Sequence, residues 1–242
     1  MTIVPDGEPT LDLNLGELIN LLKPLGIRIA VIQNSSLIWR EEVRNALLKA
    51  DWVSLKVDST RQDTWKRIDR PHGSLQLKEI LKGMKDFAEA YEGELVTETM
   101  LVQGLNDDTE NLTQTAEYIS QLNPTNAYIG IPTRPPAESW VKPPNEETLN
   151  KAYHIYESRI KNVEFLIGYE GNAFASSGNI EEDLLSITAV HPMREDAVAK
   201  LLDRNNSEGS AVTKLIEEKL LIELDYMGHR FYMRRLQTRD TP

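Results

Sequence analysis

The feature that most constrains the fold of this chain is a regular alternation of strand-length apolar runs with helix-length segments. The six expected strands are Thr2–Val4, Ile27–Ile32, Trp52–Val57, Leu95–Val102, Ala127–Ile131 and Val163–Ile167. The helices expected between them are Leu15–Leu22, Arg40–Lys49, Leu75–Tyr91, Thr109–Leu122 and Glu146–Ile160. Such alternation indicates parallel strands joined by right-handed crossovers. Because the strands are nearly continuous apolar runs, we expect both faces of the sheet to be covered.

This pattern predicts an α/β protein built on a partial parallel (β/α) barrel with fewer than eight units, in which ligands bind at the strand ends. The strand ends are polar, beginning with Asp6-Gly7-Glu8-Pro9. In the third strand Ser54, Lys56 and Asp58 alternate, so their side chains are expected on one face. Polar side chains that point inward need one another or a ligand. Two interpretations stay open here, a ligand site and a buried ion pair of Lys56 with Asp58 or Glu98.

Composition excludes several classes of function. The 242 residues, 40% of them hydrophobic, suit one medium domain with a small second one. No run approaches the roughly 20 apolar residues that span a bilayer, and no targeting segment opens the chain, so we expect a cytoplasmic protein with no membrane partner. The net charge of −11 argues against broad binding to nucleic acid or anionic lipid. Cysteine is absent, which rules out disulfides, thiolate metal sites and cysteine nucleophiles in this polypeptide.

The loop at residues 6–9 has unusual backbone chemistry. Gly7 permits close backbone approach, and Pro9 lacks an N–H and forces Glu8 into an extended conformation. Such a loop displays carbonyl oxygens beside a carboxylate at a strand end, which favours a cationic ligand such as an ammonium group. Asp-Gly and Glu-Pro are also ordinary turn pairs.

Several segments together carry a family resemblance. VPDGEPTLD resembles the GGEP loop of radical S-adenosylmethionine (SAM) enzymes, with Asp in place of its first glycine. SLKVDS at 54–59 is similar to the strand that faces the SAM ribose, and TETMLVQGLND at 97–107 and AYIGIP at 127–132 are similar to that family's fifth and sixth strands. IAVIQNSSLIWREEVRNALLKADWVSLKVDS, IDRPHGSLQLKEIL and IPTRPPAESWVKPP resemble an archaeal and bacterial subgroup related to the tRNA wyosine-synthesis radical enzyme and, more distantly, to glycyl-radical activating enzymes. The resemblance covers residues 2–190.

The resemblance implies SAM as cofactor, together with a 4Fe–4S cluster. The SAM-binding residues that it implies are Asp6, Gly7, Glu8, Pro9, Asn34, Ser54, Lys56, Asp58, Glu98, Val102, Gly104, Ile129 and Ile131. In this scheme the backbone at 6–9 brackets the SAM amino group, Lys56 lies near the ribose and carboxylate, and adenine lies along Val102. Asn34 is also a candidate for substrate contact. The other substrate candidates are Arg134, Tyr169 and Asn172, and a salt bridge from loop to helix is an alternative role for Arg134.

The sequence departs from the family at the cluster. Radical SAM enzymes hold three irons of the cluster with a CxxxCxxC loop upstream of the GGEP strand, and this cysteine-free sequence has no counterpart. We therefore expect the first βα unit to be missing, through an internal start assignment, a split gene or a truncated sequence, and the chain alone to be inactive. A strand without its neighbour is an exposed edge. We expect residues 1–5 to self-associate, or to be covered by the missing portion or by the C-terminal domain.

The character of the sequence changes after residue 178. We expect a partial barrel at 1–178, a connecting helix at 179–190 and a winged-helix-like domain at 191–242, with helices 195–202 and 211–218 and a hairpin of 220–224 with 230–235. Within 226–239 there are four arginines, no acid and interleaved aromatic residues, a modest indication of nucleic-acid binding. A docking module with a solvated basic wing is the alternative, which the acidic Glu217-Glu218 favours.

Two classes of function follow. The first is a radical SAM enzyme that acts on an unknown substrate, RNA or protein, here without its cluster-binding portion; RNA is suggested by kinship alone. The second is a non-enzymatic binding or regulatory protein built from a partial barrel and a winged helix. An aldolase-like barrel is a distant third, because no lysine lies in an evident hydrophobic nucleophile pocket.

Overall fold

The computed structural model describes residues 1–242 except 5–6, 167–176, 191, 208 and 236–242. The chain divides into two compact units. The first consists of Met1–Pro132 with Glu138–Ile167, and the second of Thr133–Ala137 with Gly168–Pro242. Each unit has its own cluster of buried apolar side chains.

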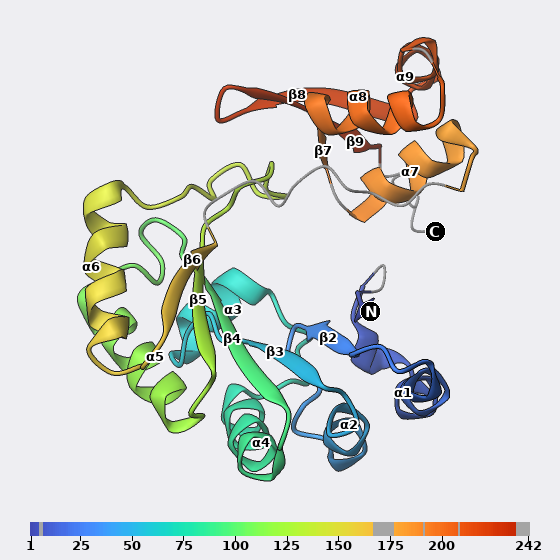
Figure 1. Ribbon diagram of the computed structural model, residues 1–242. Helices are drawn as coiled ribbons and strands as arrows, with labels where there is room; N and C mark the ends of the chain where they lie inside the picture. Colours follow the sequence, from blue (N-terminus) through green and yellow to red (C-terminus); the bar gives the residue numbers. More distant parts are fainter. Residues whose placement is uncertain (5–6, 167–176, 191, 208, 236–242) are drawn as a thin grey trace. The chain divides into compact units, whose positions relative to one another are not determined.

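The first unit contains a six-stranded sheet in the sequential order β1-β2-β3-β4-β5-β6, and each neighbouring pair is parallel (Figure 1). The strands are β1 Thr2–Ile3, β2 Ala30–Gln33, β3 Trp52–Lys56, β4 Glu94–Met100, β5 Asn126–Gly130 and β6 Val163–Leu166. The prediction of an α/β fold with parallel strands is confirmed. Among the described residues, β1 and β6 form the two edges of this sheet.

Helices connect the strands. They are η1 Pro9–Leu11, α1 Leu15–Leu22, η2 Lys23–Leu25, α2 Glu41–Leu47, α3 Gln62–Asp69, α4 Leu77–Ala90, α5 Thr109–Gln121 and α6 Glu146–Glu157. In Figure 1, α1, α2, α4, α5 and α6 form an arc along one side of the sheet. The helix starts follow from capping, since Asp108 accepts a hydrogen bond from the Asn111 amide and Asn145 accepts one from the Thr148 amide.

The register of the sheet separates a core face from a polar face. Leu55 pairs with Gln33 on one side and Thr97 on the other, and Ala127 continues the row to Val163. All five side chains of this row are buried. The residues between them point to the opposite face. On that face the register sets Lys56 beside Glu98, and Glu98 beside Tyr128.

The second unit combines three helices with a three-stranded antiparallel sheet in the order β7-β9-β8. Its elements are α7 Ile180–Val190, β7 Met193–Arg194, α8 Glu195–Arg204, α9 Ser210–Glu217, β8 Leu221–Tyr226 and β9 His229–Arg234. The helix expected as a connection is α7, and its Leu184 is fully buried in the core of this unit beside Met193 and Leu201. The strand β7 was not expected. Within the described part of the chain, every helix is too short or too polar to cross a membrane.

Candidate functional site

Glu8 fastens the loop after β1 to the end of β2. Its Oε1 accepts hydrogen bonds from the Thr10 amide at 3.0 Å and from the Thr10 hydroxyl at 2.6 Å, and its Oε2 accepts one from the Asn34 amide at 2.7 Å. Pro9 opens η1 and is buried with Thr10. The Glu8 carboxylate therefore holds the backbone of Gly7–Pro9 against β2. Asp6 lies outside the described residues.

Buried polar side chains order the turn after β2. Ser35 has a φ of 65°, a left-handed conformation that is uncommon for a residue other than glycine. Its amide donates to Gln33 Oε1 at 2.5 Å, and its hydroxyl accepts from the Lys56 amide at 2.9 Å. The Asn34 side chain accepts from the Ser36 amide at 2.9 Å and is exposed. The turn thus presents Asn34 at the carboxyl edge of the sheet, next to β3.

Lys56 is the cation of an ion-paired cluster at the end of β3. Its Nζ pairs with Asp58 and lies 3.6 Å from Asp69 of α3. The predicted pairing of Lys56 with Asp58 is confirmed, whereas Asp69 was not foreseen. Glu98 lies beside Lys56 in the register but accepts a hydrogen bond of 2.5 Å from the Ser54 hydroxyl. Ser54 and Glu98 thus form a separate pair on the polar face of the sheet.

Burial changes the proton affinity of this cluster. It lowers the pKa of Lys56, and the nearby carboxylates of Asp69 and Glu98 oppose that change. It raises the pKa of Asp69, and the Lys56 ammonium opposes that change. Desolvation disfavours the charged form of each group, while their attraction restores it. The cluster contains two carboxylates and one ammonium, so with all groups ionised it favours a cationic ligand.

Asn106 joins the loop after β4 to the end of β3. Its side-chain amide donates to the carbonyls of Asp58 and Met100, and its Oδ1 accepts from the Val102 amide, each bond measuring 2.8 Å. The Met100 amide donates to Asp58 Oδ1, also at 2.8 Å. The loop then turns at Gly104, whose φ is 72°. Asn106 therefore fixes the backbone on which the resemblance places adenine, although sequence reasoning missed it.

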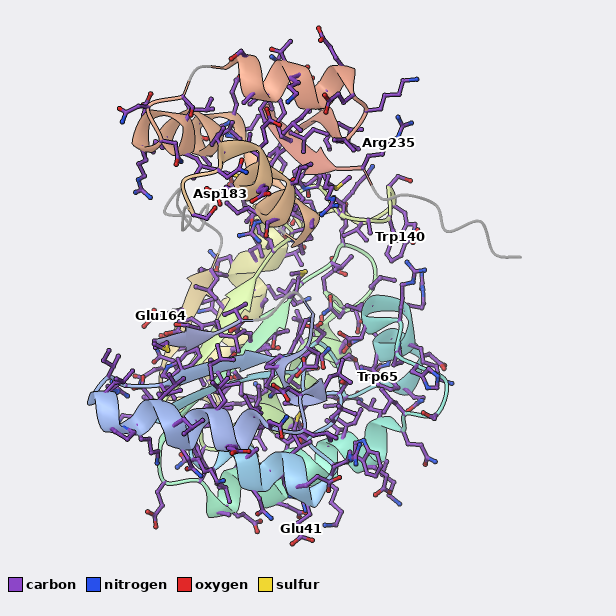
Figure 2. All side chains as sticks on the ribbon, turned by 90° about the vertical axis from the view of Figure 1, so that its right-hand side faces the viewer. Glu41, Trp65, Trp140, Glu164, Asp183 and Arg235 are labelled. Atoms are coloured by element: carbon purple, nitrogen blue, oxygen red, sulfur yellow. The ribbon has the colours of Figure 1, made fainter. Side chains whose placement is uncertain are left out.

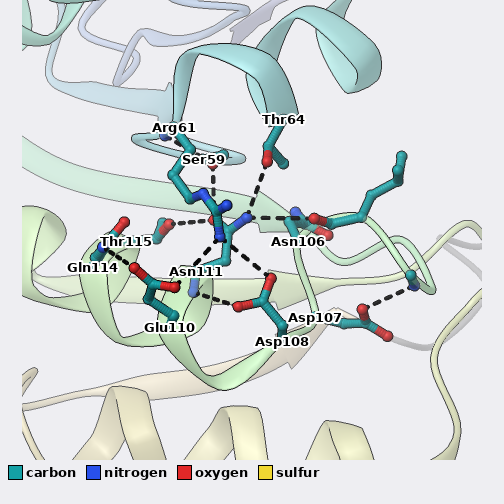
Figure 3. Close-up of polar contacts among 12 residues, drawn as sticks. Ser59, Arg61, Thr64, Asn106, Asp107, Asp108, Glu110, Asn111, Gln114 and Thr115 are labelled. Carbon is teal, nitrogen blue, oxygen red and sulfur yellow. Dashed lines mark hydrogen bonds and ion pairs between the residues drawn. The ribbon is translucent and has the colours of Figure 1, made fainter.

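A second polar network attaches α3 to α5 (Figure 3). Asn111 is fully buried, accepts from the Ser59 hydroxyl at 2.8 Å and donates to Thr64 Oγ1 at 3.2 Å. Arg61 lies 3.8 Å from Asp108 and 3.9 Å from a carboxylate oxygen of the next acid, Glu110. These contacts hold α3 beside the strand ends and so give one wall to the site.

A cavity of about 590 Å³ lies at the carboxyl ends of the first strands. Its polar lining includes Glu8, Asn34, Ser36, Lys56, Asp58, Ser59, Asp69, Arg70, His72 and Ser74. Its apolar lining consists of Leu11, Leu37, Val57, Trp65, Pro71, Leu75, Leu77, Ile80, Leu81 and Met84. Four of the predicted site residues, Glu8, Asn34, Lys56 and Asp58, therefore meet at one cavity. The residues from α3 and the following loop could not be assigned from the sequence, because α3 itself was not expected.

Other predicted residues lie apart from this cavity. Val102 is buried and Gly104 exposed in the loop after β4, and Ile131 is half-buried after β5. Ile129 is fully buried in the hydrophobic core, so its side chain faces the core and not a ligand. Arg134 belongs to the second unit. Tyr169 and Asn172 lie outside the described residues.

The residues of this chain do not fit an iron–sulfur cluster. The chain contains no cysteine, and the described residues include no group of three or more His, Asp or Glu side chains able to hold a metal ion. SAM fits better. A cavity of about 590 Å³ falls within the roughly 300–1,000 Å³ typical of sites for small organic ligands. Its carboxylates, ammonium and amide can meet the charged amino-acid part of SAM.

Comparison with known proteins agrees with this fold and site. Residues 2–116 match the radical SAM superfamily. A domain of pyruvate-formate lyase-activating enzyme from Bacteroides vulgatus has a similar fold, with a TM-score of 0.56 and 20% identity, over 68% of this chain and 97% of that domain. The fold and site thus define a protein of the radical SAM type.

Two relatives narrow the assignment. The UPF0026 protein MJ1312 of Methanocaldococcus jannaschii is 46% identical over 99% of this chain and 75% of its own length. A UPF0026 protein of Helicobacter pylori strain J99 is 29% identical over 85% of this chain and 66% of its own length, so the chain spans slightly less than two thirds of that relative. The chain belongs to the radical SAM superfamily and, within it, to the UPF0026 family.

Proposed function

We propose that the first unit binds SAM at the carboxyl edge of β1–β3, as part of a radical SAM enzyme whose cluster is held by a polypeptide other than this chain. The observation that carries the proposal is the convergence of Glu8, Asn34, Lys56 and Asp58 on one cavity. When bound, SAM supplies the sulfonium whose reductive cleavage starts radical chemistry in this superfamily.

The residues of the cavity have distinct roles in this proposal. Glu8 holds the loop backbone against the Asn34 amide, so that loop carbonyl oxygens meet the ligand ammonium. Lys56 provides the countercharge for the ligand carboxylate. Its contact with Asp69 at 3.6 Å is loose, so a ligand carboxylate can replace Asp69 as its partner. Asn106 acts through the backbone and is a positioning residue.

The proposed source of the cluster is a cysteine-bearing strand and helix that dock at the β1 edge. The surface around α1 supports this, since it exposes large apolar side chains beside a free strand edge. We call this set of side chains the α1 surface. It consists of Leu11, Leu13, Leu18, Leu21 and Leu25, which are 68%, 86%, 39%, 70% and 59% exposed. An apolar patch next to an unpaired strand marks an interaction site.

We also propose that the second unit is a winged-helix module used for protein docking. Support comes from its element order, which is helix, strand, two helices and a β-hairpin. Its basic side chains are largely engaged with its own acids. Arg230 lies 3.6 Å from both Glu195 and Glu223, and Lys214 lies 2.8 Å from Glu181. Charges that are neutralised in this way favour docking over nucleic-acid binding by the wing.

Titration of SAM into the purified chain by calorimetry tests the main proposal. Without metal coordination only hydrogen bonds and partial apolar burial remain, so we expect weak binding, with a Kd of about 1 mM. Lys56→Met should weaken it further, whereas Lys78→Met, on an exposed position of α4, should not.

The same preparation tests the assignment of the cluster. After incubation with iron and sulfide under reducing conditions, the chain should show no cluster absorbance and release no 5′-deoxyadenosine from SAM. Cleavage of SAM by this chain alone, or equal SAM binding by Lys56→Met and the parent, would contradict the proposal.

A further inference from the structure

A basic groove with an exposed tryptophan lies at the C-terminal end of α3. Its lining consists of Lys66, Arg67, Arg70, Glu138 and Trp140, and its volume is about 380 Å³. Trp140 lies on the loop before α6 and is 45% exposed (Figure 2). Lys66 and Arg67 lie on the exposed side of α3. The groove therefore joins cations from one element to an aromatic ring from another.

The charge of the groove is opposite in sign to that of the chain. It gathers three cations and one carboxylate, in a chain whose net charge is −11. Glu138 pairs with Arg70. Lys66 and Arg67 have no ion-pair partner within the described ranges, so both remain available to an anion.

Helix electrostatics explains only part of this arrangement. Lys66 and Arg67 occupy the last turn of α3, where cations are favoured by the helix dipole. That effect does not require an indole ring from a distant segment on the other side of the groove. A large exposed aromatic side chain beside cations is the combination that proteins use to bind single-stranded nucleic acid, because the ring stacks on a base and the cations meet the phosphates.

Arg70 connects this groove to the candidate SAM site, since it lines both the groove and the larger cavity. It ends α3 in a left-handed conformation with a φ of 46°. A ligand held in the groove therefore lies at the mouth of the cavity in which Lys56 and Asp69 are found.

We infer that the groove binds single-stranded nucleic acid, with Trp140 stacking on a base and Lys66 and Arg67 contacting the adjacent phosphates. As the substrate class of the proposed radical SAM enzyme, this inference rests on the proposed function. Binding itself does not, because the groove residues take no part in the SAM contacts. A free nucleotide presents the same chemistry and is distinguished by the experiment.

The test measures fluorescence anisotropy of a 5′-labelled single-stranded RNA of about ten nucleotides with the full chain at low salt. We expect Trp140→Ala to weaken binding about tenfold, in line with the loss of one stacked base. Lys66→Ala/Arg67→Ala should weaken binding at least tenfold and reduce the slope of log K against log salt by about 1.4, or 0.7 for each phosphate contact. Lys78→Ala/Lys161→Ala removes the same charge from exposed positions elsewhere and should change binding less than twofold.

Competition identifies the source of the ligand. Uridine monophosphate that competes at a concentration similar to that of the RNA, counted per nucleotide, assigns the groove to a free nucleotide of the same chemistry; weaker competition assigns it to a strand. Competition by inorganic phosphate as strong as by the nucleotide would overturn the inference, as would RNA binding that Trp140→Ala leaves unchanged or that both double variants reduce equally. SAM titration of the same variants separates the two proposals, because loss of RNA binding with SAM binding intact concerns the groove alone.

Discussion

At the scale of single residues, Asn106 is the side chain on which the geometry of the site most depends. It is 1% exposed and makes three hydrogen bonds of 2.8 Å to the backbone of Asp58, Met100 and Val102. Asn106→Ala leaves a buried amide and buried carbonyls without this partner. We expect it to lower the free energy of unfolding by about 2–4 kcal/mol, measured by urea denaturation.

Asn162→Ala is the matched control for this variant. Asn162 is exposed and its side-chain amide makes one bond, to the Thr125 carbonyl at 2.8 Å. Its loss should cost about 0.5–1 kcal/mol, because water can replace an exposed bond. Equal losses from the two variants would show that Asn106 does not stabilise the loop after β4.

The buried ammonium of Lys56 predicts a pH dependence of stability. Burial lowers the pKa of Lys56 below its ordinary value of 10.5. Between the lowered value and 10.5 the unfolded chain binds more protons at this residue than the folded chain, so the contribution of Lys56 to the free energy of unfolding rises with pH. We expect the stability of the parent relative to Lys56→Met to increase from neutral pH to about pH 10. Urea denaturation at several pH values measures it, with Lys78→Met as the charge control.

A constant difference between the parent and Lys56→Met over this pH range would contradict the assignment. A decrease would mean that the folded state binds the proton more tightly than the unfolded chain. The Asp58 and Asp69 carboxylates would then outweigh the loss of solvation at Lys56.

At the scale of elements, the position of α4 depends on one glycine. Gly83 is buried on α4, and a Cβ added there would lie 2.6 Å from the Ile38 carbonyl oxygen and 2.7 Å from the Trp39 Cα. Both are backbone atoms, so the helix would have to move. We expect Gly83→Ala to lower the free energy of unfolding by about 1–3 kcal/mol, although alanine gains about 1 kcal/mol in helix propensity.

Gly209→Ala provides a control for this substitution. Gly209 precedes α9 with a φ of −61°, and no atom lies within 4 Å of an added Cβ. Its replacement should change the midpoint of thermal unfolding little. A Gly83→Ala variant as stable as the parent would show that α4 and the segment after β2 pack less closely than the structure has them.

The sequence predicts long periodic elements well and short ones poorly. The apolar spacing of Ile80, Met84 and Phe87 predicts α4 because it repeats over several turns. In contrast, α3 spans eight residues, of which Thr64 and Trp65 are buried, so its pattern is too short to stand out. What holds α3 in place is tertiary, namely the contact of Thr64 with Asn111.

The same reasoning explains which parts of the site could be predicted. Glu8, Asn34 and Lys56 follow strand ends, and parallel strands bring their carboxyl ends to one edge, so their meeting at one cavity follows from topology. Asp69 and Asn106 come from the connections between strands. Their positions depend on how those connections fold back, which strand periodicity does not specify.

At the scale of the whole molecule, the chain offers SAM-binding groups without a place for a cluster. Both facts are chemical, since the cavity gathers an ammonium and carboxylates while the chain contains no thiolate. A radical SAM enzyme needs both parts in one site. The α1 surface and the free edge of β1 are therefore where the proposed second part is expected. The archaeal relative extends beyond the 75% of its length that this chain covers, so its unmatched part is available as a probe.

The last prediction tests this docking. The chain is co-expressed with the unmatched part of the Methanocaldococcus jannaschii relative, and the complex is measured by affinity capture and analytical ultracentrifugation. We expect a complex that Leu21→Glu disrupts, because a carboxylate on a 70% exposed leucine would have to be buried unpaired on docking. Leu166→Glu, on β6 at the opposite edge of the sheet and 45% exposed, should leave the complex intact. Equal capture of both variants would contradict docking at the α1 surface, and a dimer of this chain that Leu21→Glu alone dissociates would assign the surface to a second copy.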